Sequence, residues 1–505
     1  DRPVPLFNIG TERIDKLKFS GVIENWKHEL SNITLTGVEN YTAIDDVFYG
    51  RGYNLEYITI NFSNTLVLAT EVKKIYSNEH TGEDYPKLIR ELQHKLKQAI
   101  LNNALFFSQE NTSWKSKNIS QLLDNKMDPA IQSVDKNLYK LLKGFELLAY
   151  VNPSNTKSEL KRFKNSKFTT PPKFKYSPIK INPFELKQQL SLLKTHDISD
   201  ISVRHLYESV INSFFDKIDL LSTLDTKKFL YNSLRYFGRP SKKDLLNAQY
   251  LLHLPTIPSE PKKEPFLSMD EAMATFKAAL KTYEIDCKIE LSNKVISQVM
   301  VLNSKKTILI RPDAHFTRKE ANALIEHEIG VHMVTTQNST YQDLKIFNLG
   351  LPVNTLTQEG LAILSEYLSG NITLKRLQKI ALRVVVVDMM CSGADFIECF
   401  NYLVNQQNIP ANDAYTIVTR IFRGGGFTKD YLYLSGFAKI LKIWNSNLSL
   451  YPLLVGKTSM DFYDTIVEMT EREMIQKPKF ITKSFENPVQ YEHNTIYDYI
   501  ISGLK

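Results

Sequence analysis

Two histidines that bracket a carboxylate are the residues in this chain most able to do chemistry. His327, Glu328 and His332 lie in the stretch E-H-E-I-G-V-H, which begins at Glu326. Two imidazoles on an apolar helix are costly to bury unless they hold a cation. The common zinc-peptidase pattern H-E-x-x-H places its histidines four residues apart, about 40° around the helix axis, so that both reach one ion. The residue types therefore predict a metal site.

The spacing of the two histidines departs from that pattern, because His327 and His332 are five residues apart. In a regular α-helix their side chains would diverge by about 140° and could not share an ion. A one-residue π-bulge, with i→i+5 bonding, would restore a common face. Gly330 lies inside the spacer and fits a regular helix poorly, so the distortion is easiest there. The metal hypothesis thus requires a π-bulge; the alternative is two ordinary helix histidines.

The helix that must carry these residues has a recognisable start. Thr317 and Glu320 have the Thr-x-x-Glu spacing of a capping box, and apolar Ala321, Leu324 and Ile325 follow at helical intervals. We therefore expect the site about two turns into a helix that begins near Thr317.

A second helix supplies a third candidate ligand. The stretch T-Q-E-G-L-A, residues 357–362, opens this helix, with Glu359 in the first turn and Glu366 two turns later on the same side. Hydrolytic zinc sites use three protein ligands and one open position for water, and two histidines with one glutamate are a standard set. Glu359 is the predicted third ligand, and Glu366 is expected to support the site from behind.

The motifs together resemble a known family. H-E-I-G-x-H, Q-E-G-L-A, and R-G-G-G-F-T-K-D at 423–430 followed by Tyr433 resemble the bacterial "flavohemoglobin expression-modulating QEGLA motif" proteins. Their eukaryotic relatives are the microtubule-associated tyrosine carboxypeptidases, which remove the C-terminal tyrosine of α-tubulin. The resemblance extends over roughly residues 130–470 and includes Val151–Pro153, Phe229–Leu234 and Gly350–Pro352. The residues up to about 120 match no family that we recognise.

The resemblance assigns roles to the candidate residues. It implies that His327, His332 and Glu359 bind Zn²⁺ and that Glu328 is the catalytic base. It also implies carboxypeptidase action on the C-terminus of a peptide or protein. Two alternatives remain: a metal-binding or non-catalytic regulatory protein that modulates expression, and an endopeptidase.

The glycine-rich segment is the candidate substrate contact. Three consecutive glycines between Arg423 and Lys429 place two cations on closely approachable backbone. Capture of a peptide carboxylate by Arg423 and Lys429 fits this composition, and the phenol of Tyr433 could donate to an oxyanion. Nucleotide binding fits less well, because neither G-x-x-x-x-G-K-S/T nor G-x-G-x-x-G occurs. The alternative is a purely structural glycine turn.

Composition limits the setting. Only three cysteines, Cys287, Cys391 and Cys399, argue against a disulfide framework and favour a reducing, cytoplasmic compartment. No apolar run of 18 or more residues could span a bilayer, and no signal-like segment opens the chain. Because the chain starts at Asp1, an earlier removed leader stays an open alternative. The oligomeric state is not predicted.

The net charge of +8 is concentrated in one stretch, 157–180, where eight basic residues face a single acid, Glu159, a local charge of +7. Pro171, Pro172 and Pro178 favour extended chain there. A solvated linker is the favoured interpretation over a docking strip for nucleic acid or an acidic tail, since no aromatic ladder accompanies the charges. Nucleic acid is therefore not an expected partner.

The predicted fold class is α+β. Residues 1–150 form a mixed α/β N-terminal region, 151–183 a basic proline-containing linker, and 184–505 a mainly helical metallopeptidase-like domain with a short β-sheet. In the N-terminal region we expect strands at 56–60 and 66–68 and a helix over 85–107. In the catalytic domain we expect strands at 287–291, 295–302 and 307–311. The last is either an edge strand that receives substrate backbone or part of a purely structural hairpin. The helix at 374–390, with four consecutive valines at 384–387, is apolar nearly all round and should be buried.

Overall fold

The computed structural model describes residues 6–10, 16–35, 42–45, 68–78, 81–82, 84–123, 127–255, 264–293, 295, 298–302, 305–489 and 496–505. The chain divides into two compact units. The first comprises Asp1–Asp128, His196–His205 and Glu471–Met474, and the second comprises Pro129–Thr195, Leu206–Thr470 and Ile475–Lys505.

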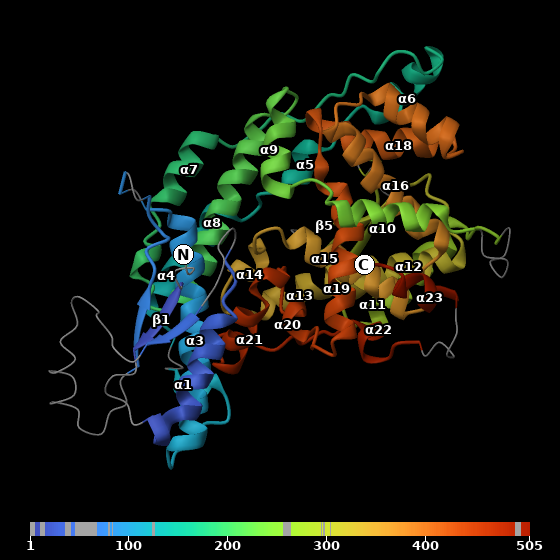
Figure 1. Ribbon diagram of the computed structural model, residues 1–505. Helices are drawn as coiled ribbons and strands as arrows, with labels where there is room; N and C mark the ends of the chain where they lie inside the picture. The colour runs from blue at the N-terminus through green and yellow to red at the C-terminus, as the bar shows by residue number, and fades with distance from the viewer. Residues whose placement is uncertain are drawn as a thin grey trace. The chain divides into compact units, whose positions relative to one another are not determined.

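The first unit has a small sheet and two long helices (Figure 1). Strand β1 (Phe7–Gly10) lies between β2 (Thr42–Asp45), which is parallel to it, and β3 (Ala69–Val72), which is antiparallel. Helix α1 (Lys16–Ser31) packs against α3 (Pro86–Asn111). The expected helix over 85–107 is confirmed by α3. The expected strand at 56–60 lies outside the described residues, as do residues 66 and 67 of the other.

The second unit is mainly helical. Its helices before the second sheet are α4 (Pro129–Leu142), α5 (Leu147–Val151), α6 (Thr156–Asn165), α7 (Pro183–Ser191), α8 (Ile201–Ser222, of which residues 201–205 belong to the first unit), α9 (Lys228–Phe237), α10 (Lys242–His253) and α11 (Met269–Thr282). Those after it are α12 (Arg318–His327), α13 (Val334–Tyr341), α14 (Ile346–Leu349), α15 (Asn354–Leu368), α16 (Leu374–Cys391), α17 (Phe396–Asn401), α18 (Ala411–Phe422), α19 (Leu432–Asn445), α20 (Tyr451–Leu454), α21 (Tyr463–Glu471), α22 (Lys483–Glu486) and α23 (Ile496–Ser502). The predicted class, a mainly helical α+β fold, is confirmed.

The sheet of this unit has the order β4-β6-β5, formed by β4 (Lys288–Leu291), β6 (Thr307–Ile310) and β5 (Val299–Leu302). Strand β6 is parallel to β4 and antiparallel to β5. The prediction that 307–311 is an edge strand is therefore wrong. All four residues of β6 are buried, as expected of a strand paired on both sides, and β5 is an edge strand instead.

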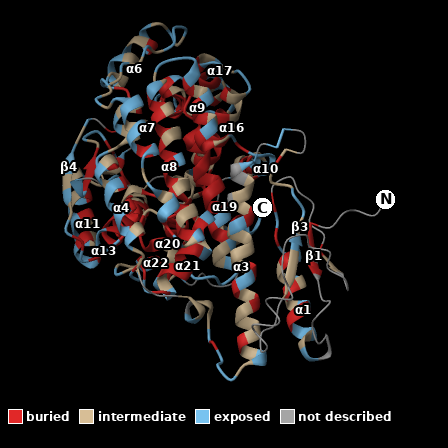
Figure 2. Cartoon of the chain, turned by 90° about the vertical axis from the view of Figure 1, so that its left-hand side faces the viewer, coloured by how far each residue is buried: buried red, intermediate tan, exposed pale blue. Residues whose placement is uncertain are grey.

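Two apolar cores hold the second unit. One joins the sheet to α11 and α12 through residues such as Phe276, Ile308 and Ile325. The other gathers α15, α16, α18 and α19, and Figure 2 shows buried residues concentrated on α16 and α19. The expected burial of the helix at 374–390 is confirmed by α16. Since α12 belongs to the first core and α15 to the second, the two candidate ligand helices meet where these cores adjoin.

Glycines let α15 approach α19 closely. A Cβ on Gly360 would lie 2.5 Å from the carbonyl carbon and oxygen of Gly436, and a Cβ on Gly436 would lie 2.1 Å from the oxygen of Leu356. No residue with a side chain fits at either position, because real Cβ atoms essentially never come this near to backbone. The glycine of Q-E-G-L-A therefore fixes the position of the helix that carries Glu359.

Candidate metal centre

The backbone between the two histidines is a π-helix. Helix α12 ends at His327, the residues Glu328–Met333 form the π-helix, and α13 begins at Val334. The π-bulge required by the five-residue spacing is therefore confirmed. It brings both imidazoles to one face, with ring centroids 4.9 Å apart. The capping box predicted at Thr317 and Glu320 is also present.

Gly330 lies in a confined space at the centre of this distortion. A Cβ there would lie 3.0 Å from the Tyr283 hydroxyl oxygen and 3.2 Å from Glu326 Oε2, tighter than nine in ten real Cβ contacts, so these side chains would have to shift. The carbonyl of Gly330 accepts a hydrogen bond of 2.6 Å from the Thr482 hydroxyl. Close packing around the spacer thus supports the π-turn.

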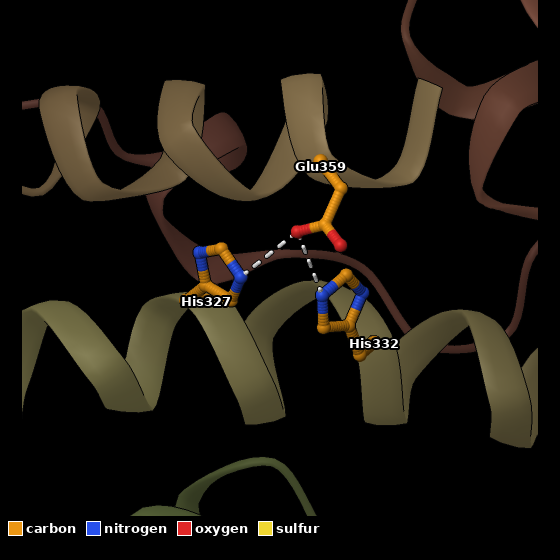
Figure 3. A group of neighbouring side chains, drawn as sticks. All are labelled: His327, His332 and Glu359. Atoms are coloured by element: carbon orange, nitrogen blue, oxygen red, sulfur yellow. Dashed lines mark ion pairs between the residues drawn. The ribbon is translucent and has the colours of Figure 1, made fainter. Parts of the chain in front are cut away.

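The two imidazoles converge on Glu359, and we call His327, His332 and Glu359 the triad (Figure 3). Glu359 Oε2 lies 3.3 Å from His327 Nε2 and 3.7 Å from His332 Nε2. One donor atom from each residue lies within 4.8 Å of the others, so the group could hold a metal ion. Within the described part of the chain, buried Glu359 Oε2 has no hydrogen-bond partner. A buried carboxylate oxygen without a partner is unfavourable, and a cation bound by both imidazoles would satisfy it.

Glu366 contacts the outer nitrogen of His327, on the same side of α15 as Glu359. Its Oε1 lies 2.7 Å from His327 Nδ1, and Arg376 donates to both of its oxygens at 2.8 and 3.0 Å. Burial alone would raise the pKa of Glu366, but Arg376 and His327 outweigh it and lower the pKa to about 2. Burial alone would lower the pKa of His327, but Glu359 and Glu366 raise it to about 10. An anionic Glu366 therefore orients the imidazole of His327 so that its Nε2 faces Glu359.

Glu328 is buried beside the triad. It lines a cavity that is also lined by residues of β5. Burial raises the pKa of its carboxyl group, while the two imidazoles and the backbone of Val301 act in the opposite direction. A carboxylate whose pKa is raised toward neutrality can accept a proton more readily than an exposed one.

The glycine-rich segment lies against the triad. Lys429 Nζ is 2.9 Å from Glu359 Oε1 and 3.3 Å from the Tyr433 hydroxyl oxygen. Burial lowers the pKa of Lys429, but Glu359 outweighs it and the pKa is raised. Arg423 lines the same cavity, and its Nη1 donates to Asn152 Oδ1. The ammonium of Lys429 is thus engaged by the triad itself, a contact that the sequence did not predict.

The three glycines are required by the backbone. Gly424, Gly425 and Gly426 have φ values of 74°, 108° and 123°, which side-chain-bearing residues rarely adopt. A Cβ on Gly424 would lie 2.5 Å from the Phe229 ring. The backbone N–H of Gly424 donates a hydrogen bond of 2.7 Å to the Tyr176 hydroxyl. The glycines form a tight structural turn, which leaves any substrate contact to the flanking side chains.

A cavity of about 350 Å³ joins these residues. It is also lined by five cations that we call the basic wall: Arg376, Lys379 and Arg383 of α16 with Arg420 and Arg423. The sequence predicted 374–390 only as a buried core helix, so the contribution of these α16 side chains to the cavity was not expected. Their spacing was the available signal, because residues at i, i+3 and i+7 share one face of a helix.

Two histidines and one glutamate on paired helices, beside a cavity lined by basic side chains, form a group that could hold a metal ion. The chain belongs to the microtubule-associated tyrosine carboxypeptidase family, whose family model matches residues 161–502. At the level of the family it is a tyrosine carboxypeptidase-like peptidase.

Two other comparisons complete these findings. None of the curated proteins compared with the chain matches it. One solved structure that is similar carries the description "putative lipoprotein from Colwellia psychrerythraea". The two are 13% identical, with 80% of this chain and 74% of that chain covered and a TM-score of 0.34. In the described part of the chain, no helix is both long and apolar enough to cross a membrane.

Proposed function

We propose that this protein is a zinc-dependent carboxypeptidase that removes a residue from the C-terminus of a peptide or protein. The observation that carries the proposal is Glu359 Oε2, a buried oxygen without a hydrogen bond in the described chain that faces two imidazole nitrogens. His327, His332 and Glu359 would hold the ion, as a common ligand set of hydrolytic zinc sites. When bound, zinc supplies a Lewis acid that lowers the pKa of water and polarises a carbonyl group.

Glu328 is the proposed general base. It is buried next to the triad, and burial raises the pKa of its carboxyl group. Glu328 would take a proton from the attacking water and deliver it to the leaving amine.

Tyr433 is the proposed donor to the developing oxyanion. Its hydroxyl oxygen lies 3.3 Å from Lys429 Nζ and 3.4 Å from Arg420 Nη2. Ammonium and guanidinium groups can only donate, so the tyrosine oxygen accepts from both neighbours. The single hydroxyl hydrogen is therefore left for a third group in the cavity, as oxyanion stabilisation requires.

Substrate backbone and carboxylate have separate proposed contacts. Edge strand β5 lines the cavity with Val299, Met300 and Val301 and can add an extended peptide as a further strand. Arg423 remains the proposed contact to the terminal carboxylate. Lys429, whose ammonium lies against Glu359, is proposed to hold that ligand in place more than to bind substrate.

The test compares peptides with a free and an amidated C-terminus, incubated with the zinc-loaded protein in the presence and absence of a chelator. Loss of exactly one C-terminal residue from the free acid alone, abolished by the chelator, is the expected result in mass spectra. Equal cleavage of the amidated peptide would favour the endopeptidase alternative. Stoichiometric metal binding without cleavage of either peptide would favour the regulatory alternative.

A further inference from the structure

Among the arginines of the basic wall, Arg383 has the weakest contacts with the described residues. It is 7% exposed and lines the cavity, and its buried Nε has no hydrogen-bond partner among those residues, as is also true of Arg423 Nε. Its recorded ion-pair contact joins Nε to Asp430 Oδ2 at 3.9 Å, and Asp430 is already held by Arg420 at 2.5 and 3.1 Å. The guanidinium of Arg383 lies over the Tyr433 ring, 5.1 Å from its centroid.

The neighbouring arginines on this wall are differently placed. Arg376 binds both oxygens of Glu366, and Arg420 binds both oxygens of Asp430. Arg423 has one nitrogen committed to Asn152. Burial, followed by repulsion from Arg420, lowers the pKa of Arg383 to about 10, and the same two causes lower the pKa of Arg423 to about 10, so the surroundings of both groups disfavour the charge. A buried cation is retained at such a cost where a ligand supplies the missing anion.

The chemistry of that anion follows from the shape of the donor. A guanidinium offers two parallel N–H groups that match the two oxygens of a carboxylate, whereas an ammonium is a point charge. We propose that Arg383 binds the C-terminal carboxylate of the substrate and thereby restricts cleavage to chains with a free C-terminus. This inference rests on the proposed peptidase function and adds to it the residue that decides exopeptidase specificity. Arg423, from another element of the wall, supplies a supporting contact.

Binding is measured without turnover in the zinc-loaded Glu328→Gln protein by titration calorimetry. The probes are N-acetyl-alanyl-tyrosine and its C-terminal amide. We expect the acid to bind more tightly than the amide. Adding Arg383→Met should weaken binding of the acid by about 10- to 100-fold and leave binding of the amide unchanged. Arg383→Lys should recover only part of the loss, because it restores the charge and not the fork.

Lys379→Met is the matched control, since Lys379 lies one turn before Arg383 on α16, lines the same cavity and carries the same charge. It should weaken acid binding by about fivefold at most. If the Lys379 and Arg383 variants lose equal affinity, the effect comes from the net charge of the cavity and the assignment is overturned.

Thermal unfolding separates recognition from a structural role. Replacing a buried cation that has no close partner by an apolar side chain is often neutral or stabilising. The Arg383→Met protein should therefore keep or raise its Tm while it loses acid binding. A lower Tm with equal losses for acid and amide would identify Arg383 as structural and overturn the proposal.

Activity distinguishes failure of this inference from failure of the proposed function. If the zinc-loaded wild type cleaves the free-acid peptide and Arg383→Met keeps full discrimination against the amide, the peptidase proposal stands and the role of Arg383 does not. If the wild type cleaves neither peptide but acid binding still depends on Arg383, the anion site stands and the peptidase proposal does not.

Discussion

The triad and the basic wall face the same cavity and differ in the kind of charge that each leaves unpaired. At the triad, cations and imidazoles surround the carboxylates, and the atom that finds no hydrogen-bond partner among the described residues is an acceptor, Glu359 Oε2. On the basic wall, carboxylates are too few for the arginines, and the groups left over are donors, above all Arg383. An unfilled buried acceptor indicates a missing cation, and an unfilled buried donor indicates a missing anion. The difference predicts one ligand of each sign in one cavity.

The largest effect on zinc content and turnover should follow from removing the Glu359 carboxylate. Glu359→Ala removes one of three predicted ligands, so zinc content, measured by mass spectrometry of the metal, should fall from about one per chain to near zero, with loss of turnover. The control Glu398→Ala removes an exposed glutamate of the α17 capping box and should keep its zinc. Full zinc occupancy in the Glu359 variant would remove this residue from the ligand set, and the contrast between the triad and the basic wall would no longer hold.

A loss of chemistry without loss of metal is expected next. Glu328→Gln should retain zinc and lower kcat by about 10²- to 10⁴-fold, since the amide cannot accept the proton of the water. Rates come from single-residue release in mass spectra, and metal content is measured on the same sample. An unchanged kcat would contradict the proposed mechanism.

On the basic wall, Arg423→Met should cost about 1.5 to 3 kcal/mol, or roughly ten- to a hundredfold in kcat/KM for a free-acid peptide. Zinc content should not change. Amidation of the substrate should also lower kcat/KM in the wild type, and its effect should be smaller in the variant, where Arg383 alone is left to bind the carboxylate. Independent, additive losses would mean that Arg423 is structural.

The support of the triad from behind should have the smallest effect. Glu366→Gln keeps a hydrogen bond to His327 Nδ1 but loses the charge that Arg376 and the imidazole share, and the loss of such a partner typically weakens metal binding about 10- to 100-fold. Competition with a chromophoric chelator measures this affinity. Unaltered affinity would show that orientation of His327 does not depend on the carboxylate.

The local sequence determined the elements that carry the two histidines of the triad. The capping box at Thr317 starts α12, and the five-residue spacing of the histidines demands a π-turn, for which Gly330 leaves room. These are short-range effects of hydrogen bonding and steric fit, so they can be inferred from a few consecutive residues. The start of the next helix was less well predicted, because α15 begins at Asn354 and Glu359 therefore lies in its second turn, not its first.

Only the tertiary structure decided how the charges are paired and which strand lies at the edge. The sequence shows that Arg376, Lys379 and Arg383 share a helix face, but whether each meets a carboxylate depends on α15, α18 and the glycine-rich segment. Lys429 was predicted from the sequence as a substrate contact. In the structure its ammonium contacts Glu359, 70 positions away. Strand β6 is central because β4 and β5 pair with its two sides. These outcomes depend on contacts between distant segments, which no local pattern of residues specifies.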